Sequence, residues 1–299
     1  MSFSYETKNE LCRLPVQKLC CARAEAYGIL LYCNTFNSAE VRIITENPQF
    51  AQRLPRLFRR AFNLQFDRQP EKEQEGKNIF QIVDPEKLNR IINQLGFDPQ
   101  QNLVLHINFG ILEEDCCKAA FLRGVFFAGG SITDPQKRYH LELTTSHLQV
   151  SRELNVFLQE CGFTPKDVPR NGSMVTYFKQ SEHIEDFLTM IGAPVAAMNM
   201  MSAKMEKDLR NSVNRRLNCD SANLDKAVEA AQEQLEAIRK LREANLLEQL
   251  PDKLQQTAGL RLENPELTLS ELAEEFDSPV TKSCLNHRLR KLIALAKDL

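Results

Sequence analysis

The alternation of apolar and polar positions along the first two-thirds of the chain predicts an ordered series of helices and strands. Residues 24–36 and 120–132 are short apolar segments, each with a glycine near its middle, and both predict a buried helix. An alternating stretch follows each segment, at residues 39–47 and 139–147, and its period of two is typical of a strand. The same pair of elements therefore occurs twice along the chain.

The later elements of the two series also correspond. In each series the strand leads into an amphipathic helix, a second strand region and a short helix that ends at glycine: residues 48–62, 78–84 and 85–96 in the first, and residues 148–163, 173–180 and 181–192 in the second. Gly28 and Gly124 are 96 residues apart, and so are Gly96 and Gly192. Recurrence of every element in order indicates an internal duplication.

The duplication predicts an α+β fold built from two α-β-β-α-β-β-α half-domains. We place the first in residues 1–112 and the second in residues 116–205. Small residues such as Gly124 and Ala128 allow the two apolar helices to approach closely, so we expect these helices to form a pseudo-twofold interface flanked by two sheets. The polar stretch 66–78 predicts an exposed hairpin tip or loop.

Composition and charge limit the class of protein. A chain of 299 residues with 42% hydrophobic and 26% charged residues has enough apolar material for a core, and its length favours two domains. The net charge of -2 means that any nucleic-acid surface must come from local clusters. No long apolar run and no signal-peptide core occur, so we expect a cytoplasmic protein without a membrane span.

The nine cysteines are expected to be reduced thiols that pack as small apolar groups. No CxxC pair occurs, and the doublets Cys20-Cys21 and Cys116-Cys117 lack the spacing of metal ligands. The sequence therefore predicts no metal site and no cofactor.

The segment FLRGVFFAGGSI, residues 121–132, resembles the motif helix of LAGLIDADG homing endonucleases, and the duplicated order of elements resembles their two-repeat, single-chain form. In those nucleases the last acid of each motif helix binds Mg²⁺, which activates water and stabilises the leaving oxygen. The resemblance places these acids at Cys33 and Gly129, neither of which offers a carboxylate to a hard cation. It therefore implies a scaffold without nuclease activity. Asp134, just beyond the second helix, leaves a nuclease with relocated acids as the alternative.

Several arginines make the first half-domain locally basic: Arg53, Arg56, Arg59, Arg60 and Arg68. One interpretation is a solvated helix face. The other is a surface that contacts the phosphates of a nucleic acid.

The composition changes after Pro194, and the rest of the chain predicts helices. Residues 206–222 are polar and rich in arginine and asparagine, and we expect a linker that is at least partly helical. The segment 224–244 has apolar residues along one face of a long helix. This face favours core packing within a small helical domain, which we place at residues 223–299. A coiled-coil dimer is the alternative.

The end of the chain has the layout of a helix-turn-helix, with its core at residues 268–297. Thr268 and Glu271 form a capping-box sequence before a short helix, a turn follows, and Thr281 can cap a second helix. Apolar residues share one face of that second helix, and the remaining residues suit base edges and phosphates, although an exposed helix with ordinary polar residues would have the same pattern. We predict DNA contacts by Thr281, Lys282, Ser283, Asn286, His287, Arg288, Arg290 and Lys291, with a second contact point at Arg210, Asn211, Asn214 and Arg215.

A degenerate LAGLIDADG scaffold joined to a helix-turn-helix resembles the WhiA family of bacterial transcriptional regulators. The resemblance runs along the chain, from MSFSYETKNEL through FLRGVFFAGGSITDPQKRYHLEL and RNSVNRRLNCDSANLDK to KSCLNHRLRKL. It implies a non-catalytic, nucleoid-associated protein that binds double-stranded DNA mainly through the helix-turn-helix. It also implies a role in cell division, chromosome segregation or sporulation, and partners such as the transcription machinery or a co-regulator protein. An adaptor in division or in the nucleoid that acts mainly through protein contacts is the further alternative.

Overall fold

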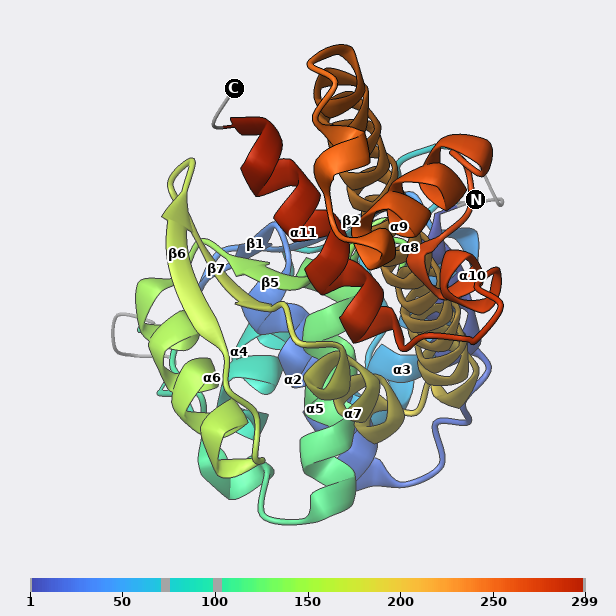
Figure 1. Ribbon diagram of the computed structural model, residues 1–299. Coiled ribbons are helices and arrows are strands. Elements are labelled where there is room, and N and C mark those ends of the chain that lie inside the picture. Colours follow the sequence, from blue (N-terminus) through green and yellow to red (C-terminus); the bar gives the residue numbers. More distant parts are fainter. Residues whose placement is uncertain (1, 71–75, 99–103, 298–299) are drawn as a thin grey trace. The chain divides into compact units, whose positions relative to one another are not determined.

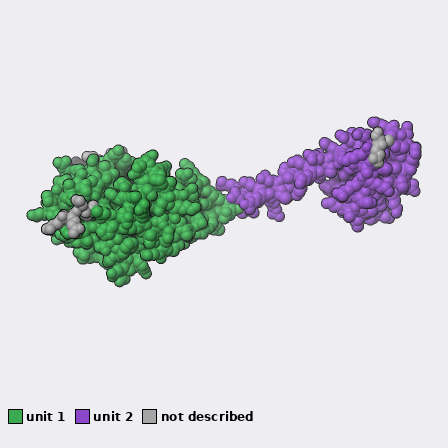
Figure 2. Space-filling model, turned by 90° about the vertical axis from the view of Figure 1, so that its left-hand side faces the viewer, with its two compact units in different colours: residues 1–208 green, residues 209–299 purple. Residues whose placement is uncertain are grey.

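The computed structural model describes residues 2–70, 76–98 and 104–297. The chain divides into two compact units, residues 1–208 and residues 209–299 (Figure 2). The long helix α8 (Pro194–Glu243) begins in unit 1 and ends in unit 2. Among the described residues, no helix combines the length and the apolar character that crossing a membrane would require.

Unit 1 contains the two series of elements that the sequence predicts. After α1 (Phe3–Cys12), the first repeat consists of α2 (Leu19–Tyr32), β1 (Thr35–Phe36), β2 (Val41–Thr45), α3 (Pro48–Phe62), β3 (Asn78–Ile82) and α4 (Pro85–Gln94). The second repeat follows the short helix η1 (Phe109–Ile111) and consists of α5 (Asp115–Gly129), β4 (Gly130–Ile132), β5 (Leu141–Thr145), α6 (Leu148–Glu160), β6 (Lys166–Arg170), β7 (Ser173–Phe178) and α7 (Ser181–Ile191). The predicted duplicated α+β fold is confirmed.

Each repeat forms an antiparallel sheet with corresponding strand order. The second sheet has the order β4-β5-β7-β6. In the first sheet β1, β2 and β3 pair in the same way, and a single bridge between Arg68 and Gln81 stands where β6 pairs with β7. Within the described residues, the predicted fourth strand of the first repeat is therefore reduced to this bridge. Residues 71–75 of the predicted loop 66–78 lie outside the described residues.

Helices α2 and α5 lie side by side in the middle of unit 1 (Figure 1) and approach each other at two glycines. A Cβ added to Gly28 would lie 2.2 Å from the carbonyl oxygen of Phe121, and one added to Gly124 would lie 2.0 Å from that of Glu25. Both contacts join backbone to backbone, so only glycine permits this separation. The two contacted residues, Glu25 and Phe121, are 96 positions apart, as Gly28 and Gly124 are. Each contact therefore corresponds to the other when the two repeats are exchanged. This is the predicted pseudo-twofold interface.

A buried ion cluster joins α2 to α3 and α5. Glu25 is 2% exposed, and its carboxylate accepts hydrogen bonds from Arg53 at 2.6 and 2.9 Å and from Arg123 at 3.0 Å. Arg53 also donates to the backbone carbonyls of Cys12 and Leu14. The assignment of Arg53 to a basic surface is therefore wrong. Its guanidinium is buried because helix α3 turns this position toward α2, where a carboxylate neutralises it.

Unit 2 is helical, and its core is formed by the end of α8 together with α9 (Asp252–Glu263), α10 (Leu269–Glu274) and α11 (Lys282–Lys297). The apolar face predicted along residues 224–244 is buried only in its later part. Ile238 and Leu241 belong to the core, whereas Leu224 and Val228 are 63% and 48% exposed, so core packing was the wrong prediction for the first turns. Residues 206–222, the expected linker, lie inside α8.

Candidate nucleic-acid interface

Side-chain caps position the two helices α10 and α11. The Thr268 hydroxyl accepts a hydrogen bond from the Glu271 amide at 3.4 Å, and the Glu271 carboxylate accepts one from the Thr268 amide at 2.8 Å. This is the predicted capping box, and the hydrogen bonds that Thr268 donates, first from its backbone amide, hold the pKa of the Glu271 carboxyl below its ordinary value. The Thr281 hydroxyl accepts from the Cys284 amide at 3.2 Å and caps α11. Both predicted helix starts are confirmed.

Helix α11 separates an apolar face from a polar one. Leu285, Leu289 and Leu292 are at most 1% exposed and pack in the core of unit 2. The solvent side of the same helix carries five of the predicted contact residues, Lys282, Ser283, His287, Arg290 and Lys291. Within the described part of the chain, none of the three cations in this group takes part in an ion pair. Their charges are therefore available to an anionic partner.

Arg288 and Asn286 differ from the other predicted contact residues because both are only partly exposed. The Arg288 guanidinium carbon lies 5.5 Å from the centre of the Phe276 ring, which is itself buried near the end of α10. Such cation–π stacking contributes about 0.5–1 kcal/mol at an accessible site and restricts the direction of the guanidinium. Arg288 thus connects α11 to the preceding turn.

The second predicted group lies on α8. Arg210, Asn211, Asn214 and Arg215 are all exposed. The same stretch of helix also carries apolar side chains that are between 48% and 69% exposed: Leu209, Val213, Leu217, Leu224 and Val228. This part of α8 therefore offers both a polar and an apolar surface in unit 2.

The C-terminal ends of α2 and α5, where the nuclease resemblance places the metal-binding acids, carry no carboxylate at those positions, and no side chain fits at Gly129. A Cβ on Gly129 would lie 2.4 Å from the Thr144 carbonyl oxygen and 2.6 Å from the Tyr32 ring. The Cys33 Sγ lies 3.2 Å from the Leu30 carbonyl oxygen and 3.1 Å from that of Thr35, and either oxygen can accept its one hydrogen. Burial raises the pKa of this thiol to about 12. Neither position can offer an anionic ligand to a divalent cation at neutral pH.

Asp134, the acid that would serve a relocated nuclease site, has a structural contact of its own. Its carboxylate accepts a hydrogen bond from the Gln136 amide at 2.9 Å, and its carbonyl accepts from Lys137 at 2.9 Å. These bonds form the turn that follows β4. The residue is exposed and belongs to this loop.

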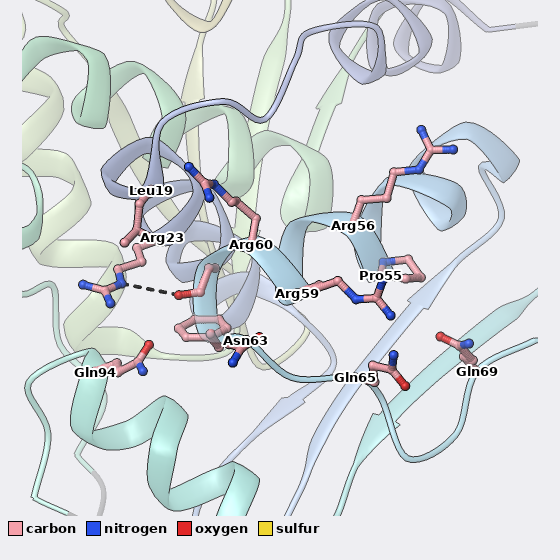
Figure 3. Close-up of a pocket in the computed structure, with 12 residues that line it drawn as sticks. Leu19, Arg23, Pro55, Arg56, Arg59, Arg60, Asn63, Gln65, Gln69 and Gln94 are labelled. Atoms are coloured by element: carbon pink, nitrogen blue, oxygen red, sulfur yellow. Dashed lines mark hydrogen bonds between the residues drawn. The ribbon is translucent and has the colours of Figure 1, made fainter.

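The arginines of α3 other than Arg53 line an open hollow of about 770 Å³ (Figure 3). Arg56, Arg59 and Arg60 come from α3, and Arg23 comes from α2. Arg23 and Arg60 donate to the backbone carbonyls of Ala61 and Gln17, at 3.4 and 2.8 Å. No carboxylate is among the described residues that line the hollow. The phosphate-contact interpretation stays a prediction for this surface.

Two cysteine doublets that are distant in the sequence meet at the N-terminal ends of α2 and α5. The Sγ atoms of Cys20, Cys21, Cys116 and Cys117 all lie within 4.8 Å of one another. Each doublet lacks the spacing of metal ligands along the chain. The packing of the two helices brings the four sulfur atoms to a spacing that their positions along the chain do not show.

The fold and the comparisons with known proteins both indicate a protein that joins a LAGLIDADG-like scaffold to a C-terminal helix-turn-helix. The family model of the WhiA LAGLIDADG-like domain matches residues 118–210, and that of the WhiA C-terminal HTH domain matches residues 213–296. "Probable cell division protein WhiA" of Ruminiclostridium cellulolyticum is 34% identical over 307 residues, covering 100% of this chain and 98% of the relative. Its counterpart in Carboxydothermus hydrogenoformans is 37% identical over 305 residues, with the same coverage. The chain belongs to the WhiA family.

The crystal structure of full-length WhiA from Thermotoga maritima has a similar fold. It matches with a TM-score of 0.58 and 23% sequence identity, covering 100% of this chain and 99% of that one. The architecture is therefore shared along the whole chain.

Proposed function

We propose that this protein is a non-catalytic, sequence-specific DNA-binding regulator whose main contact with DNA is α11. The exposed face of α11 carries the proposal, because its polar and cationic residues stand on a helix that is fixed by caps and by its buried leucines. An α-helix with side chains is about 10–12 Å wide and fits the major groove of B-DNA, which is about 12 Å wide. The proposal rests on this match of shape and charge.

Within this interface the side chains divide into two groups by chemistry. Asn286, His287 and Arg290 carry the planar donors and acceptors that pair with base edges. Lys282, Arg288 and Lys291 provide positive charge for phosphates, while the Ser283 hydroxyl suits either partner and Thr281 acts through the helix start. Arg210, Asn211, Asn214 and Arg215 on α8 form the proposed second contact point.

Binding measured over a range of salt concentrations tests the division. Arg290→Ala and Asn286→Ala should weaken specific binding by about 1–3 kcal/mol and relax the base preference. Lys291→Ala should weaken binding to all sequences alike and lower the salt slope by about 1. Lys253→Ala, an exposed cation on α9, is the matched control and should change neither. Unchanged binding after truncation at Asn264 would refute the assignment of the helix-turn-helix.

The absence of catalysis is supported by the closed site at Gly129, the neutral Cys33 thiol and the turn contact of Asp134. Incubation of the purified protein with supercoiled and target DNA in Mg²⁺ or Mn²⁺ tests this directly. We expect no cleavage. Cleavage that is lost in Asp134→Asn would replace the proposal with a nuclease that uses relocated acids.

The cellular role follows from the relatives, whose name is that of a cell division protein. We infer that the regulated genes belong to division or to the linked processes of chromosome segregation and sporulation, and that the protein associates with the nucleoid. Chromatin occupancy and transcript levels in a strain that carries Arg290→Ala test this role. Both occupancy and the transcription of neighbouring genes should change together.

The exposed apolar residues of α8 favour a second candidate, an adaptor that acts through protein contacts. Five large apolar side chains between Leu209 and Val228 are about half exposed or more, and such surface commonly marks a protein interface. Occupancy on the chromosome without any effect on nearby transcription, together with loss of function in Leu217→Ser, would favour the adaptor.

A further inference from the structure

Four cysteine side chains gather at the N-terminal ends of α2 and α5, at the opposite end of the helix pair from Cys33 and Gly129. Cys20 and Cys21 are the second and third residues of α2, and Cys116 and Cys117 are the second and third residues of α5. Both pairs are related by an offset of 96 residues, which also relates Gly28 to Gly124. The two doublets are therefore equivalent positions of the two repeats, and they face each other across the pseudo-twofold axis.

The separations of the sulfur atoms suit one tetrahedral ion. All four Sγ atoms lie within 4.8 Å of one another, and those of Cys20 and Cys21 are 3.9 Å apart. A tetrahedral zinc site with a Zn–S distance of about 2.3 Å places neighbouring sulfurs about 3.8 Å apart. Shifts of about 1 Å or less, within the range of cysteine side-chain torsions, would therefore complete the coordination.

Unpaired amide groups and an opening to solvent lie beside the cluster. All four residues are free cysteines, and they lie in the first turns of two helices, where unpaired amide groups favour negative charge. The N-cap residues Lys18 and Glu114 make no side-chain capping bond to these turns. Cys117 is buried while Cys20 is exposed, so the cluster has one packed side and one side open to solvent. An ion can enter from the open side.

We propose that Cys20, Cys21, Cys116 and Cys117 bind one Zn²⁺ and that this ion joins the two repeats of unit 1. Four soft thiolates select zinc over the hard cations that a nuclease would use. A shell of four cysteines leaves no position for a reactive water, so the site is structural. Because its ligands come from both repeats, the ion opposes separation of α2 from α5.

The test uses the full chain, prepared with a reductant, loaded with Zn²⁺ and desalted. We expect about one zinc per chain by elemental analysis, and the absorption spectrum of a tetrathiolate site when Co²⁺ replaces zinc. At a free Zn²⁺ concentration of about 100 times Kd, the Tm should rise by roughly 5–10 °C. Alkylation of the four thiols should slow when zinc is bound.

Two serine variants separate ligation from packing. Cys20→Ser and Cys116→Ser should each weaken zinc binding by more than about 100-fold. Since Cys20 is exposed, Cys20→Ser should leave the Tm of the metal-free chain unchanged. Cys219→Ser, an exposed thiol on α8, is the control and should bind zinc as the natural chain does.

Three outcomes would overturn the proposal. The first is a natural chain that retains no zinc after desalting. The second is a Cys20→Ser variant that binds zinc as tightly as the Cys219→Ser control. The third is a metal-free chain that loses two alkylatable thiols of the cluster once the reductant is removed, because that result would indicate a disulfide between the repeats.

Discussion

Substitution of Gly124 by alanine tests whether the close contact of α2 and α5 holds unit 1 together. The added Cβ would stand 2.0 Å from the Glu25 carbonyl oxygen and 3.0 Å from the Ile29 amide nitrogen. Both neighbours are backbone atoms of α2, so no side-chain rotation can relieve the overlap. Ordinary contact begins near 3.4 Å, and the two helices would have to separate by more than about 1 Å.

The magnitude follows from two opposing effects. Overpacking in a close-packed interior costs about 1–3 kcal/mol, and a gap of about 1 Å along the rest of the interface removes up to half of its dispersion energy. Replacing glycine by alanine within a helix stabilises it by about 1 kcal/mol, which acts in the other direction. We expect a net destabilisation of about 2 kcal/mol, which corresponds to a fall in Tm of about 4–8 °C for a unit of this size.

Calorimetry of the full chain measures the shift, and hydrogen exchange locates it. Peptides from α2 and α5 should exchange faster in Gly124→Ala, while those from unit 2 should not change. Gly259→Ala on α9 is the matched control, because nothing lies within 4 Å of the added Cβ, and it should raise stability by up to about 1 kcal/mol. A Tm for Gly124→Ala equal to or above that of the natural chain would refute the reasoning.

Three further changes probe other parts of the molecule. Glu25→Gln leaves the buried Arg53 and the partly buried Arg123 without a carboxylate and should cost about 3–5 kcal/mol in urea unfolding. The exposed control Glu46→Gln should stay within about 0.5 kcal/mol, and equal effects of the two substitutions would contradict the role of the cluster. Burial lowers the pKa of Lys8 from 10.5 to about 8, so the folded chain releases this proton at a lower pH than the unfolded chain does. The folded state therefore gains stability as the pH rises from about 8 to about 10.5. Lys8→Met should abolish this gain, which amounts to about 3 kcal/mol between about pH 8 and about pH 10.5, and identical pH profiles of the two proteins would argue against it. Thr268→Ala removes the capping box and should lower the stability of unit 2 by about 1 kcal/mol in thermal unfolding, while Ser270→Ala in the same helix should not. A Thr268→Ala effect no larger than that of Ser270→Ala would show that the cap is dispensable.

The duplication and the helix-turn-helix were predictable because both depend on local signals. The period of apolar residues determines which face of each helix or strand is buried, and the order of elements recurs at one offset. The capping box at Thr268 and the cap at Thr281 involve residues only three positions apart. The inward face with Leu285, Leu289 and Leu292 follows from helical geometry alone.

Burial was harder to predict where it depends on a partner from elsewhere in the chain. Arg53 looks like its neighbours Arg56 and Arg59 in the sequence, yet it is buried because Glu25 lies opposite it. Leu224 and Val228 continue the apolar face of α8 but are exposed, since unit 2 packs only against later turns of that helix. Periodicity identifies a face, and only the tertiary structure shows what covers it.

The two ends of the α2–α5 pair show the same division between local and distant information. The residue types at positions 33 and 129 already excluded a pair of acids, while the contacts of Thr144 and Tyr32 with Gly129 show that no side chain fits there. The cysteine doublets carried a usable signal, their offset of 96 residues, but adjacent cysteines are not spaced as metal ligands along the chain. Their four sulfur atoms come together because Gly28 and Gly124 allow two backbones to touch. The separation of those backbones is a property of packing, which no local pattern specifies.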